Sequence, residues 1–443
     1  MGGKLKIPVF MVLPFFLASC WMLAGLEKSD LPGPDAADVS EDDGMHMDAD
    51  APDADDDADG AEQPGDGPEE MEQEDAAGDA DDPEAEAEDG FDAPSEPPDD
   101  PDALEEFDDS FDVEPDDMPE DAAIEDMPAD EPDGPPRLTC PGATTLEELV
   151  GCITVQMPRE GSEGFVAPDN RAQSNWASVA RRMLQGHCDE IDVPIELENI
   201  IRVFTFNDSS TSRDFCVLME TLDEDADGTV DRGWGTFIVD PDPSRELNIH
   251  ITHPVFCTTT ELEGVSIFKG VGGRSYLMGG AHREANSRIS SCQAAYFEAD
   301  AAHNVNNMDQ PAVREIMSFY ADLGRAFVSI QYHGMASASC LGVDVYMTYG
   351  RSTNPSPDAI LIDLRDNLRT NNPDWVVNVP GDTPPCTMSG STNVQGRLLN
   401  DVPGNIVCTA PAIVTTGRFI YIEQKTEMRL PDDWIDAIVE TWP

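Results

Sequence analysis

Positive charge is scarce in this chain of 443 residues, and one long segment has none. Residues 30–136 contain 47 acidic residues and 16 prolines but no lysine or arginine. Branched and aromatic residues are also few there, so the segment cannot bury enough apolar area to offset the entropy lost on ordering its backbone. We therefore expect it to be disordered. No basic patch occurs elsewhere, which argues against nucleic acid as a partner.

Three catalytic or redox motifs are missing as well. The sequence contains no Gly-x-Ser-x-Gly, no glycine-rich phosphate loop and no Cys-x-x-Cys. It therefore gives no sign of a nucleophile elbow, a phosphate-binding loop or a dithiol redox centre. The remaining residues, 137–443, have a formal charge of −20 and are numerous enough for one large domain or two small ones.

The folded part begins with a helical pattern from Arg137 to about Asn207, after which short strands alternate with helices. This alternation predicts an α/β fold with a mostly parallel layered sheet and helices on both faces. The expected helices are 144–155, 170–185, 261–268, 311–323, 358–368 and 431–441, and the expected strands are 215–219, 236–239, 247–252, 275–278, 327–332, 343–347, 375–379 and 419–422. The working site of such a sheet lies beyond the carboxyl ends of its strands.

The first twenty residues indicate export. Lys4 and Lys6 precede an apolar run over 7–17, which is too short to span a bilayer but has the length of a signal-peptide core. The run ends in Leu-Ala-Ser-Cys20, which resembles the bacterial lipobox. That resemblance implies a cleaved signal peptide over 1–19 and a lipid on Cys20 that attaches the protein to a membrane. An ordinary signal peptide or a short anchor helix is the alternative.

The residues after Cys20 refine this expectation. Trp21 stands where an Asp often retains lipoproteins in the inner membrane, which favours the outer membrane or the cell surface. Residues 20–136 would then form a lipid-anchored tether. Like charges and prolines would extend this tether and hold the folded part away from an anionic envelope surface.

The cysteines agree with an oxidising compartment. Nine of them lie between Cys140 and Cys408, and most should pair in disulfides. Sequence proximity favours the pairs 140–152, 188–216, 292–340 and 386–408, although spacing does not determine connectivity. This scheme gives Cys257 no place; in the alternative, another cysteine is left over and Cys257 is simply buried.

A run of aspartates resembles a calcium loop. Carboxylates alternate around Gly228, as in loops that gather oxygen ligands for Ca²⁺. The four aspartates are Asp223, Asp225, Asp227 and Asp231. Trp234 stands where such a loop ends in Glu, so an acidic turn without an ion is the alternative.

A stronger pattern begins at the strand that ends near His253. After a loop, Thr260 and Glu263 fit a capping box, which would give Glu263 a structural task at the start of a helix. Glu261 is left over. An imidazole at a strand end and a carboxylate in the next turn can share one zinc ion. A buried histidine bonded to backbone is the alternative for His253 taken alone.

Two later strands repeat the arrangement. The strand from Phe327 ends in His333, followed by Gly334, a residue that lets backbone or ligand approach closely. The strand near the end of the chain runs into Glu423. Two histidines and one glutamate around zinc, with a second glutamate as base, form a known hydrolytic site.

This order of motifs resembles the zinc carboxypeptidase superfamily, and especially its bacterial poly-γ-glutamate hydrolase branch. The motifs are strand-His-loop-Glu, then strand-Tyr-His-Gly, and finally strand-Ile-Glu followed by Arg. Residues 393–397, Asn-Val-Gln-Gly-Arg, and the segment 423–429 match two further features of that branch. The resemblance covers 246–443, and residues 137–245 would form the N-terminal helical and strand part of the folded region. N-formylglutamate amidohydrolases show similar features, so the amide bond is better indicated than the substrate.

The resemblance implies roles for individual residues. His253, Glu261 and His333 would bind zinc, and Glu423 would be the general base. The family's ligand glutamate lies closer to its histidine than Glu261 does, so Glu263 or Cys257 is the alternative ligand.

The implied substrate is an anionic peptide or a γ-glutamyl polymer. Arg283 can bind a carboxylate with its planar guanidinium, and Asn286 and Arg397 are further expected substrate contacts. Asp300 and His303 are weaker candidates for orienting a ligand. The sequence thus predicts an exported zinc-dependent amide hydrolase. A non-catalytic surface-binding lipoprotein on the same fold is the rival.

Overall fold

The computed structural model describes residues 137–443. The predicted signal peptide, the lipid site at Cys20 and the tether over 20–136 lie outside the described residues. Within 137–443, no helix is both long and apolar enough to cross a membrane.

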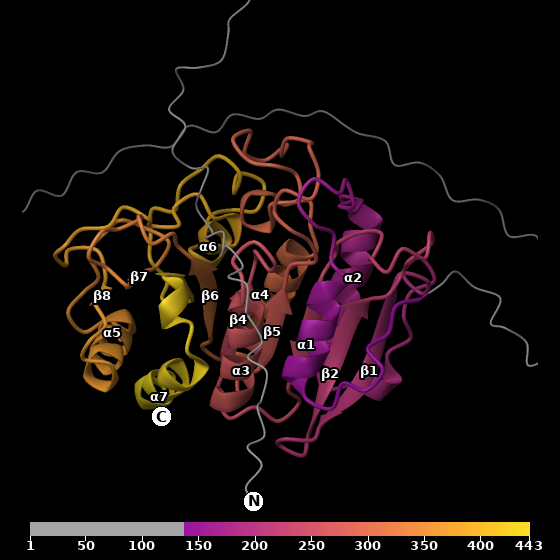
Figure 1. Cartoon of the computed structure of the whole chain (residues 1–443), viewed down its shortest axis with the longest axis horizontal. Helices are drawn as coiled ribbons and strands as arrows, with labels where there is room; N and C mark the ends of the chain where they lie inside the picture. The colour runs from indigo at the N-terminus through magenta and orange to yellow at the C-terminus, as the bar shows by residue number, and fades with distance from the viewer. Residues whose placement is uncertain (1–136) are drawn as a thin grey trace, which may run out of the picture. The chain divides into compact units, whose positions relative to one another are not determined.

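One sheet of nine strands organises the described residues (Figure 1). Its spatial order is β1-β2-β3-β5-β4-β6-β9-β7-β8. The strands are β1 (Ile201–Asp208), β2 (Arg213–Glu220), β3 (Thr236–Val239), β4 (Leu247–Ile251), β5 (Ser275–Met278), β6 (Val328–Gly334), β7 (Val345–Thr348), β8 (Val377–Asn378) and β9 (Phe419–Gln424). Because β3 pairs with β5, the sheet is continuous across residue 245, where the sequence suggested two parts.

The sheet is mixed, which corrects the expectation of a mostly parallel sheet. Strands β5, β4, β6 and β9 pair in parallel, as do β7 and β8. The β1–β2, β2–β3, β3–β5 and β7–β9 pairs are antiparallel. A parallel pair needs a crossover connection, usually a helix. The short turn between β1 and β2 and the helix-free loop between β2 and β3 allow antiparallel neighbours instead.

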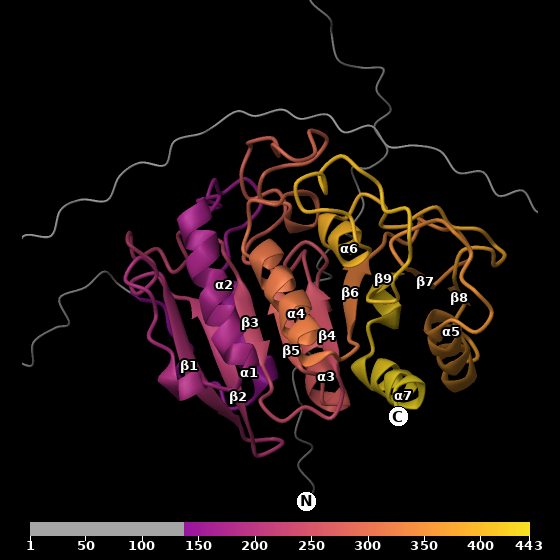
Figure 2. The same cartoon turned by 180° about the vertical axis from the view of Figure 1, so that it is seen from behind.

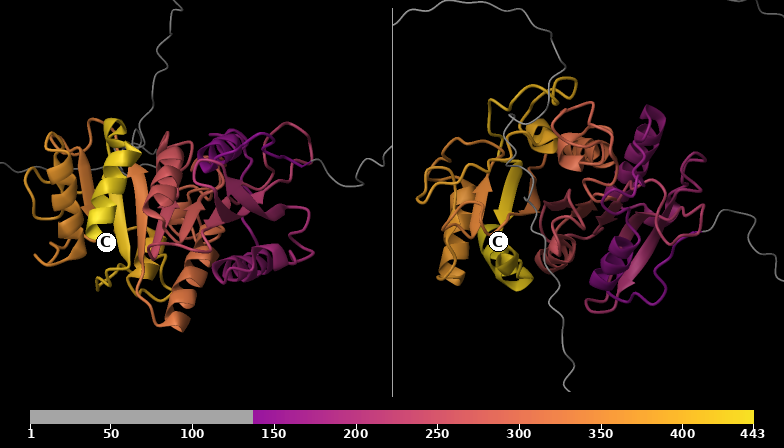
Figure 3. Two further views of the ribbon diagram at one scale, coloured as in Figure 1. Left: turned by 90° about the horizontal axis from the view of Figure 1, so that it is seen from below. Right: turned by 45° about the horizontal axis from the view of Figure 1, so that its top comes forward.

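Helices cover both faces of the sheet, as expected (Figures 1 and 2). One face packs against α1 (Leu146–Val155), α3 (Thr260–Val271), α5 (Ile360–Asn371) and α7 (Pro431–Thr441). The other packs against α2 (Asn170–Leu184), α4 (Asp309–Leu323) and α6 (Val394–Leu399). Figure 3 shows the sheet between the two layers. Short 3₁₀ segments occur at Cys188–Glu190, Ala301–His303 and Thr426–Met428.

The apolar spacing of the sequence explains these layers. Helix α2 buries Trp176, Val179 and Met183, which lie on one side of a helix. Alternate residues of each strand face opposite layers. On β6, Ile330 packs in the core under α3 and α7, and the intervening residues face the layer of α4 and α6.

Most expected elements are confirmed within a few residues, but two were missed. The helical pattern up to Asn207 is wrong over β1, which is an edge strand. Several of its residues are exposed or only half-buried, which weakens the apolar alternation that marks a strand. The short helix α6 was not expected either.

Four disulfides join eight of the nine cysteines in the described residues. The predicted pairs Cys140–Cys152 and Cys188–Cys216 are confirmed. The other two predictions are wrong, because the chain forms 292–408 and 340–386 bridges. These bridges join loops that the fold brings together, and sequence proximity does not report such contacts. No described cysteine is free, so leaving Cys257 over was also wrong.

Candidate metal centre

The carboxyl ends of three neighbouring parallel strands bring three of the predicted residues, His253, His333 and Glu423, to one edge of the sheet. His253 follows β4 by two residues, His333 is the penultimate residue of β6, and Glu423 lies on β9. Glu423 is the register partner of His333. Side chains in register on adjacent strands project to the same face. His333 and Glu423 therefore both face the layer of α4 and α6.

A cavity of about 230 Å³ opens at this edge. Loops far apart in the sequence contribute its walls. They are His253, Arg283, Ala302, His303, His333, residues 387–393 and Tyr421.

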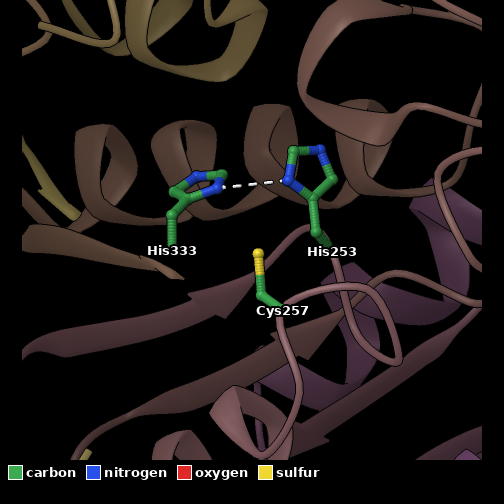
Figure 4. Close-up of side chains that lie close together, drawn as sticks. All are labelled: His253, Cys257 and His333. Carbon is green, nitrogen blue, oxygen red and sulfur yellow. Dashed lines mark hydrogen bonds between the residues drawn. The ribbon is translucent and has the colours of Figure 1, made fainter. Parts of the chain in front are cut away.

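The two histidines point toward each other across this space (Figure 4). Their Nδ1 atoms are 3.2 Å apart, and their rings meet nearly edge to face, with centroids at 4.9 Å. Both side chains are buried.

The hydrogen-bond partner of Nε2 identifies the tautomer of each ring. His253 Nε2 lies 2.8 Å from Asp300 Oδ1, and His333 Nε2 lies 2.9 Å from Gln331 Oε1. A carboxylate oxygen and an amide oxygen only accept hydrogen bonds, so both Nε2 atoms donate. Each neutral ring then has a lone pair on Nδ1, and the two lone pairs face each other.

The surroundings keep both rings neutral. Burial, reinforced by the charge of Arg283 and opposed by Asp300, lowers the pKa of His253 to about 4. Burial, together with His253, His303 and Arg283, holds the pKa of His333 well below its usual range. Neither ring is therefore expected to place a second proton in the gap at neutral pH.

Asp300 fixes the orientation of the His253 ring through its contact with Nε2. Its carboxylate also accepts from His303 Nδ1 at 3.0 Å and forms an ion pair with Arg283. Burial alone would raise the pKa of Asp300, but Arg283, His303 and His253 hold it well below the usual value. A buried carboxylate that stays ionised gives His253 a permanent acceptor on Nε2.

Two facing lone pairs in a buried site suit a cation. Zinc binds imidazole nitrogens at about 2.0–2.1 Å with tetrahedral angles, which separates two such nitrogens by about 3.3 Å. The observed 3.2 Å between the Nδ1 atoms agrees with this separation. Cys257 Sγ lies within 4.8 Å of both histidines and points toward the gap (Figure 4). Because Cys257 is not free, only the two imidazoles are taken as the donor set.

Glu261 and Glu263 lie in a different cluster, on the face covered by α3 and α7. We call Glu261, Glu263 and Arg429 the carboxylate cluster. Gln424 Nε2 donates to Glu263 at 2.7 Å, and Arg429 donates to the carbonyl of Thr258.

The expected capping box is wrong, because the hydroxyl of Thr260 donates to the carbonyl of Cys257 and Thr259 occupies the cap position. Burial raises the pKa of Glu261, while hydrogen bonds from the backbone amides of Glu261, Thr259 and Val255 lower it. These amides belong to the turn that leads from His253 into α3. Glu261 therefore lies against this turn.

Glu423 lies one hydrogen bond from the cavity. The hydroxyl of Tyr421, which lines the cavity, donates to Glu423 Oε1 at 2.5 Å. The ring of Tyr421 also packs against His333, with centroids at 4.7 Å. Glu423 itself is fully buried.

The three expected substrate contacts lie in different surroundings. Arg283 lines the cavity, with its charge paired to Asp300 and its guanidinium over the rings of Phe256 and Tyr296. Asn286 donates to Glu298 and to a backbone carbonyl. Arg397 donates to three backbone carbonyls, at residues 391, 407 and 408. In the described part of the chain, neither Asn286 nor Arg397 lines the cavity.

The four aspartates of the expected calcium loop lie between β2 and β3. Oxygens of Asp223, Asp225 and Asp227 come within 4.8 Å of one another. Asp223 accepts from two backbone amides of the same turn, at Asp227 and Gly228. Asp231 accepts from the backbone amide of Glu224 instead.

Several polar residues of the site were not expected from the sequence. Gln331, His250 and Tyr421 lie on the strands that carry the histidines and Glu423, and Asp309 and Asn393 lie at the starts of α4 and α6. A signal was present, because polar residues alternate along two otherwise apolar strands. They are Asn248 and His250 on β4, with Thr252 directly after it, and Ser329, Gln331 and His333 on β6. Such a period of two places them all on one buried face.

Comparisons with known proteins give only remote likenesses. No family model matches the chain, and no curated protein matches it. The crystal structure of gene product Atu2144 from Agrobacterium tumefaciens aligns with 44% of this chain and 87% of its own, at a TM-score of 0.26 and 10% identity. A metallo-carboxypeptidase from Burkholderia cenocepacia aligns over 59% of this chain and 66% of its own, at a TM-score of 0.23 and 11% identity. Likenesses this remote assign neither a family nor an activity.

Proposed function

We propose that the protein is a metal-dependent hydrolase that cleaves an amide bond, with zinc as the metal. The observation that carries this proposal is the approach of the Nδ1 atoms of His253 and His333 to 3.2 Å beside a cavity. Each ring is held in the Nε2-protonated tautomer by an acceptor on Nε2. Metal-binding histidines are commonly oriented in this way.

The residues around the pair have separate tasks. A bound zinc ion polarises a carbonyl group and makes water more acidic. Glu423 would accept the proton of the attacking water through the hydroxyl of Tyr421, which donates to it, and would return a proton to the leaving amine by the same route. Tyr421 orients Glu423 through its hydroxyl and forms part of the cavity wall.

The proposed substrate is a peptide or γ-glutamyl amide. Arg283 is the cationic side chain among the described residues that line the cavity, which supports a contact with an anionic group. Its pairing with Asp300 makes that contact weaker than one to an unpaired arginine would be. The order of the strand-end motifs, which resembles that of zinc carboxypeptidases, supports the same class of bond.

Metal content is the first test. The full chain, purified oxidised and without added metal, is expected to hold about one tightly bound zinc ion, which should be lost in His333→Ala. Glu423→Gln should keep zinc and lose about 10²–10⁴ in the rate of amide hydrolysis. A panel of α- and γ-glutamyl amides would identify the preferred bond.

The opposite results would favour the rival. If zinc offered in excess of a competing chelator does not bind, the protein is no zinc hydrolase. A tethered surface-binding module would then be the better account. Hydrolysis that is unchanged in Glu423→Gln would remove the general-base role while leaving the metal site.

Export and lipid anchoring are part of the proposal. The four disulfides of the folded part support an oxidising compartment. We propose that Cys20 carries the lipid and that the acidic tether presents the hydrolase at the outer membrane or cell surface. The mass of the N-terminal peptide from native protein, compared with Cys20→Ser, tests the modification.

A further inference from the structure

Gln331 connects His333 with a second buried histidine, His250. Gln331 Nε2 donates to His250 Nδ1 at 3.0 Å, and its Oε1 accepts from His333 Nε2 at 2.9 Å. Asn393 Nδ2 donates to the same oxygen at 2.5 Å. All four side chains are buried. The orientation of this one amide therefore decides which nitrogen of His333 carries the proton.

Asp309 fixes the tautomer of His250, which bonds the nitrogen of the Gln331 amide. His250 Nε2 lies 2.8 Å from Asp309 Oδ2, and the carboxylate accepts. The proton of the His250 ring is thus on Nε2, which leaves Nδ1 to accept from Gln331. Asp309 is the first residue of α4, where the helix dipole stabilises a negative charge.

Asn393 fixes the position of the Gln331 amide oxygen, to which it donates. It is the N-cap of α6, and its Oδ1 accepts from the backbone amide of Gly396 at 2.7 Å. Its Nδ2 therefore faces Gln331. A reversed Gln331 would set two amide NH₂ groups against each other, and a reversed Asn393 would lose the cap.

We infer that these four side chains form a positioning chain that keeps the proton of His333 on Nε2. Its members are Asp309, His250, Gln331 and Asn393. With Gln331 reversed, its Nε2 would donate to His333 Nε2, and the ring proton would move to Nδ1. That proton would occupy the 3.2 Å gap to His253 Nδ1. The positioning chain thus keeps the gap open for a cation, a consequence that rests on the proposed metal site.

The tautomer can be measured without metal. Long-range ¹H–¹⁵N spectra of the metal-free full chain report which ring nitrogen is protonated in each of its seven histidines, and His333→Gln assigns the signal. We expect His333 to carry its proton on Nε2. A proton on Nδ1 would overturn the inference.

Two variants test whether the chain controls metal affinity. Asn393→Asp keeps the helix cap but offers only acceptors to Gln331, so it favours the reversed amide. We expect the His333 proton to move to Nδ1 and zinc affinity to fall about 10–100-fold. The matched control is Asn170→Asp, the same change at the exposed first residue of α2, away from the histidines. It should keep zinc affinity within about threefold of the wild type.

The outcomes separate this inference from the proposed function. Equal losses of zinc affinity in both variants, or an unchanged His333 tautomer in Asn393→Asp, would overturn the inference of a positioning chain. Should Asn393→Asp fail to fold, the wild-type tautomer decides. An Nε2 proton on His333 in a protein that binds no zinc would refute the metal site and leave the chain standing.

Discussion

Two buried polar clusters lie on opposite faces of the same strand ends, and they differ in how their polar atoms are satisfied. In the imidazole cluster, built on His253 and His333, each Nε2 has its own acceptor and each Nδ1 faces a shared gap. In the carboxylate cluster, Glu261 Oε2, Glu263 Oε1, and Arg429 Nε and Nη2 are buried with no hydrogen-bond partner among residues 137–443. The first cluster lines a cavity, while the second packs beneath α3 and α7.

The contrast shows why composition alone does not identify metal ligands. A metal ion needs ligands that have already lost their protons. Burial lowers the pKa of both imidazoles, so they are neutral and ready to bind. Burial raises the pKa of Glu263 to about 8 and also raises that of Glu261. The same burial therefore prepares histidines for a metal and makes glutamates poorer ligands.

The largest expected effect is on zinc affinity, and it distinguishes the imidazole cluster from the carboxylate cluster. His253→Ala should lower zinc affinity by more than about 100-fold, because it removes one of two imidazole ligands. Glu261→Gln should keep zinc affinity within a few-fold, because Glu261 lies on the face of the sheet opposite the two histidines. Competition with a chromophoric chelator measures both. Loss of zinc in Glu261→Gln, in a variant that unfolds like the wild type, would make Glu261 a ligand after all.

The carboxylate cluster should instead be visible in the pH dependence of stability. Glu263 has a pKa of about 8 in the folded protein, against 4.5 as its ordinary value. Between these values the unfolded chain has lost a proton that the folded protein keeps, so wild-type stability should fall as the pH rises from about 5 to 8.

Glu263→Gln removes this titration. Relative to the wild type, the variant should gain roughly 1–4 kcal/mol in unfolding free energy between pH 5 and pH 8. Urea unfolding at both pH values measures the difference, with Glu440→Gln, on an exposed part of α7, as the control. If the unfolding free energies of Glu263→Gln and the wild type changed equally between pH 5 and pH 8, Glu263 would be ionised in the folded protein.

The sequence predicted the layers of the fold better than the direction of its strands. Helical and strand periodicity report which residues are buried, and these patterns located α2, β4 and β6 closely. Pairing direction depends on the connection between strands, and nothing in β2 or β3 itself marks them as antiparallel. The wrong disulfides, at Cys292 and Cys340, have the same origin, since they join loops that meet only after folding.

Part of the site could also be predicted from the sequence. Strand-end position and residue chemistry brought out His253, His333 and Glu423, which the fold places at one edge of the sheet. Glu261 was chosen over Glu263 because a capping box was expected, and the structure has none there. Hydrogen-bond partners such as Gln331 decide the tautomers, and they become visible only when β4 and β6 are aligned side by side.

The smallest expected effect concerns Gly334, where the two clusters come closest along β6. His333 faces the imidazole cluster, and Gly334 faces the other layer, where a Cβ would lie 1.9 Å from Arg429 Nη2 and 2.7 Å from its Cζ. Gly334→Ala should push Arg429 from Thr258 and cost about 1–3 kcal/mol of stability. Zinc affinity should change less than about threefold, because the bonds of His333 lie on the opposite face.

A matched glycine makes this comparison decisive. Gly151 lies within α1, and a Cβ there would meet only ordinary contact, 3.7 Å from Leu262. Gly151→Ala should therefore be neutral or stabilising by up to about 1 kcal/mol. If Gly334→Ala lost zinc while keeping wild-type stability, displacement of Arg429 would be acting through His333. The two clusters would then be one coupled unit, because a change confined to one face of β6 would have altered ligands on the other.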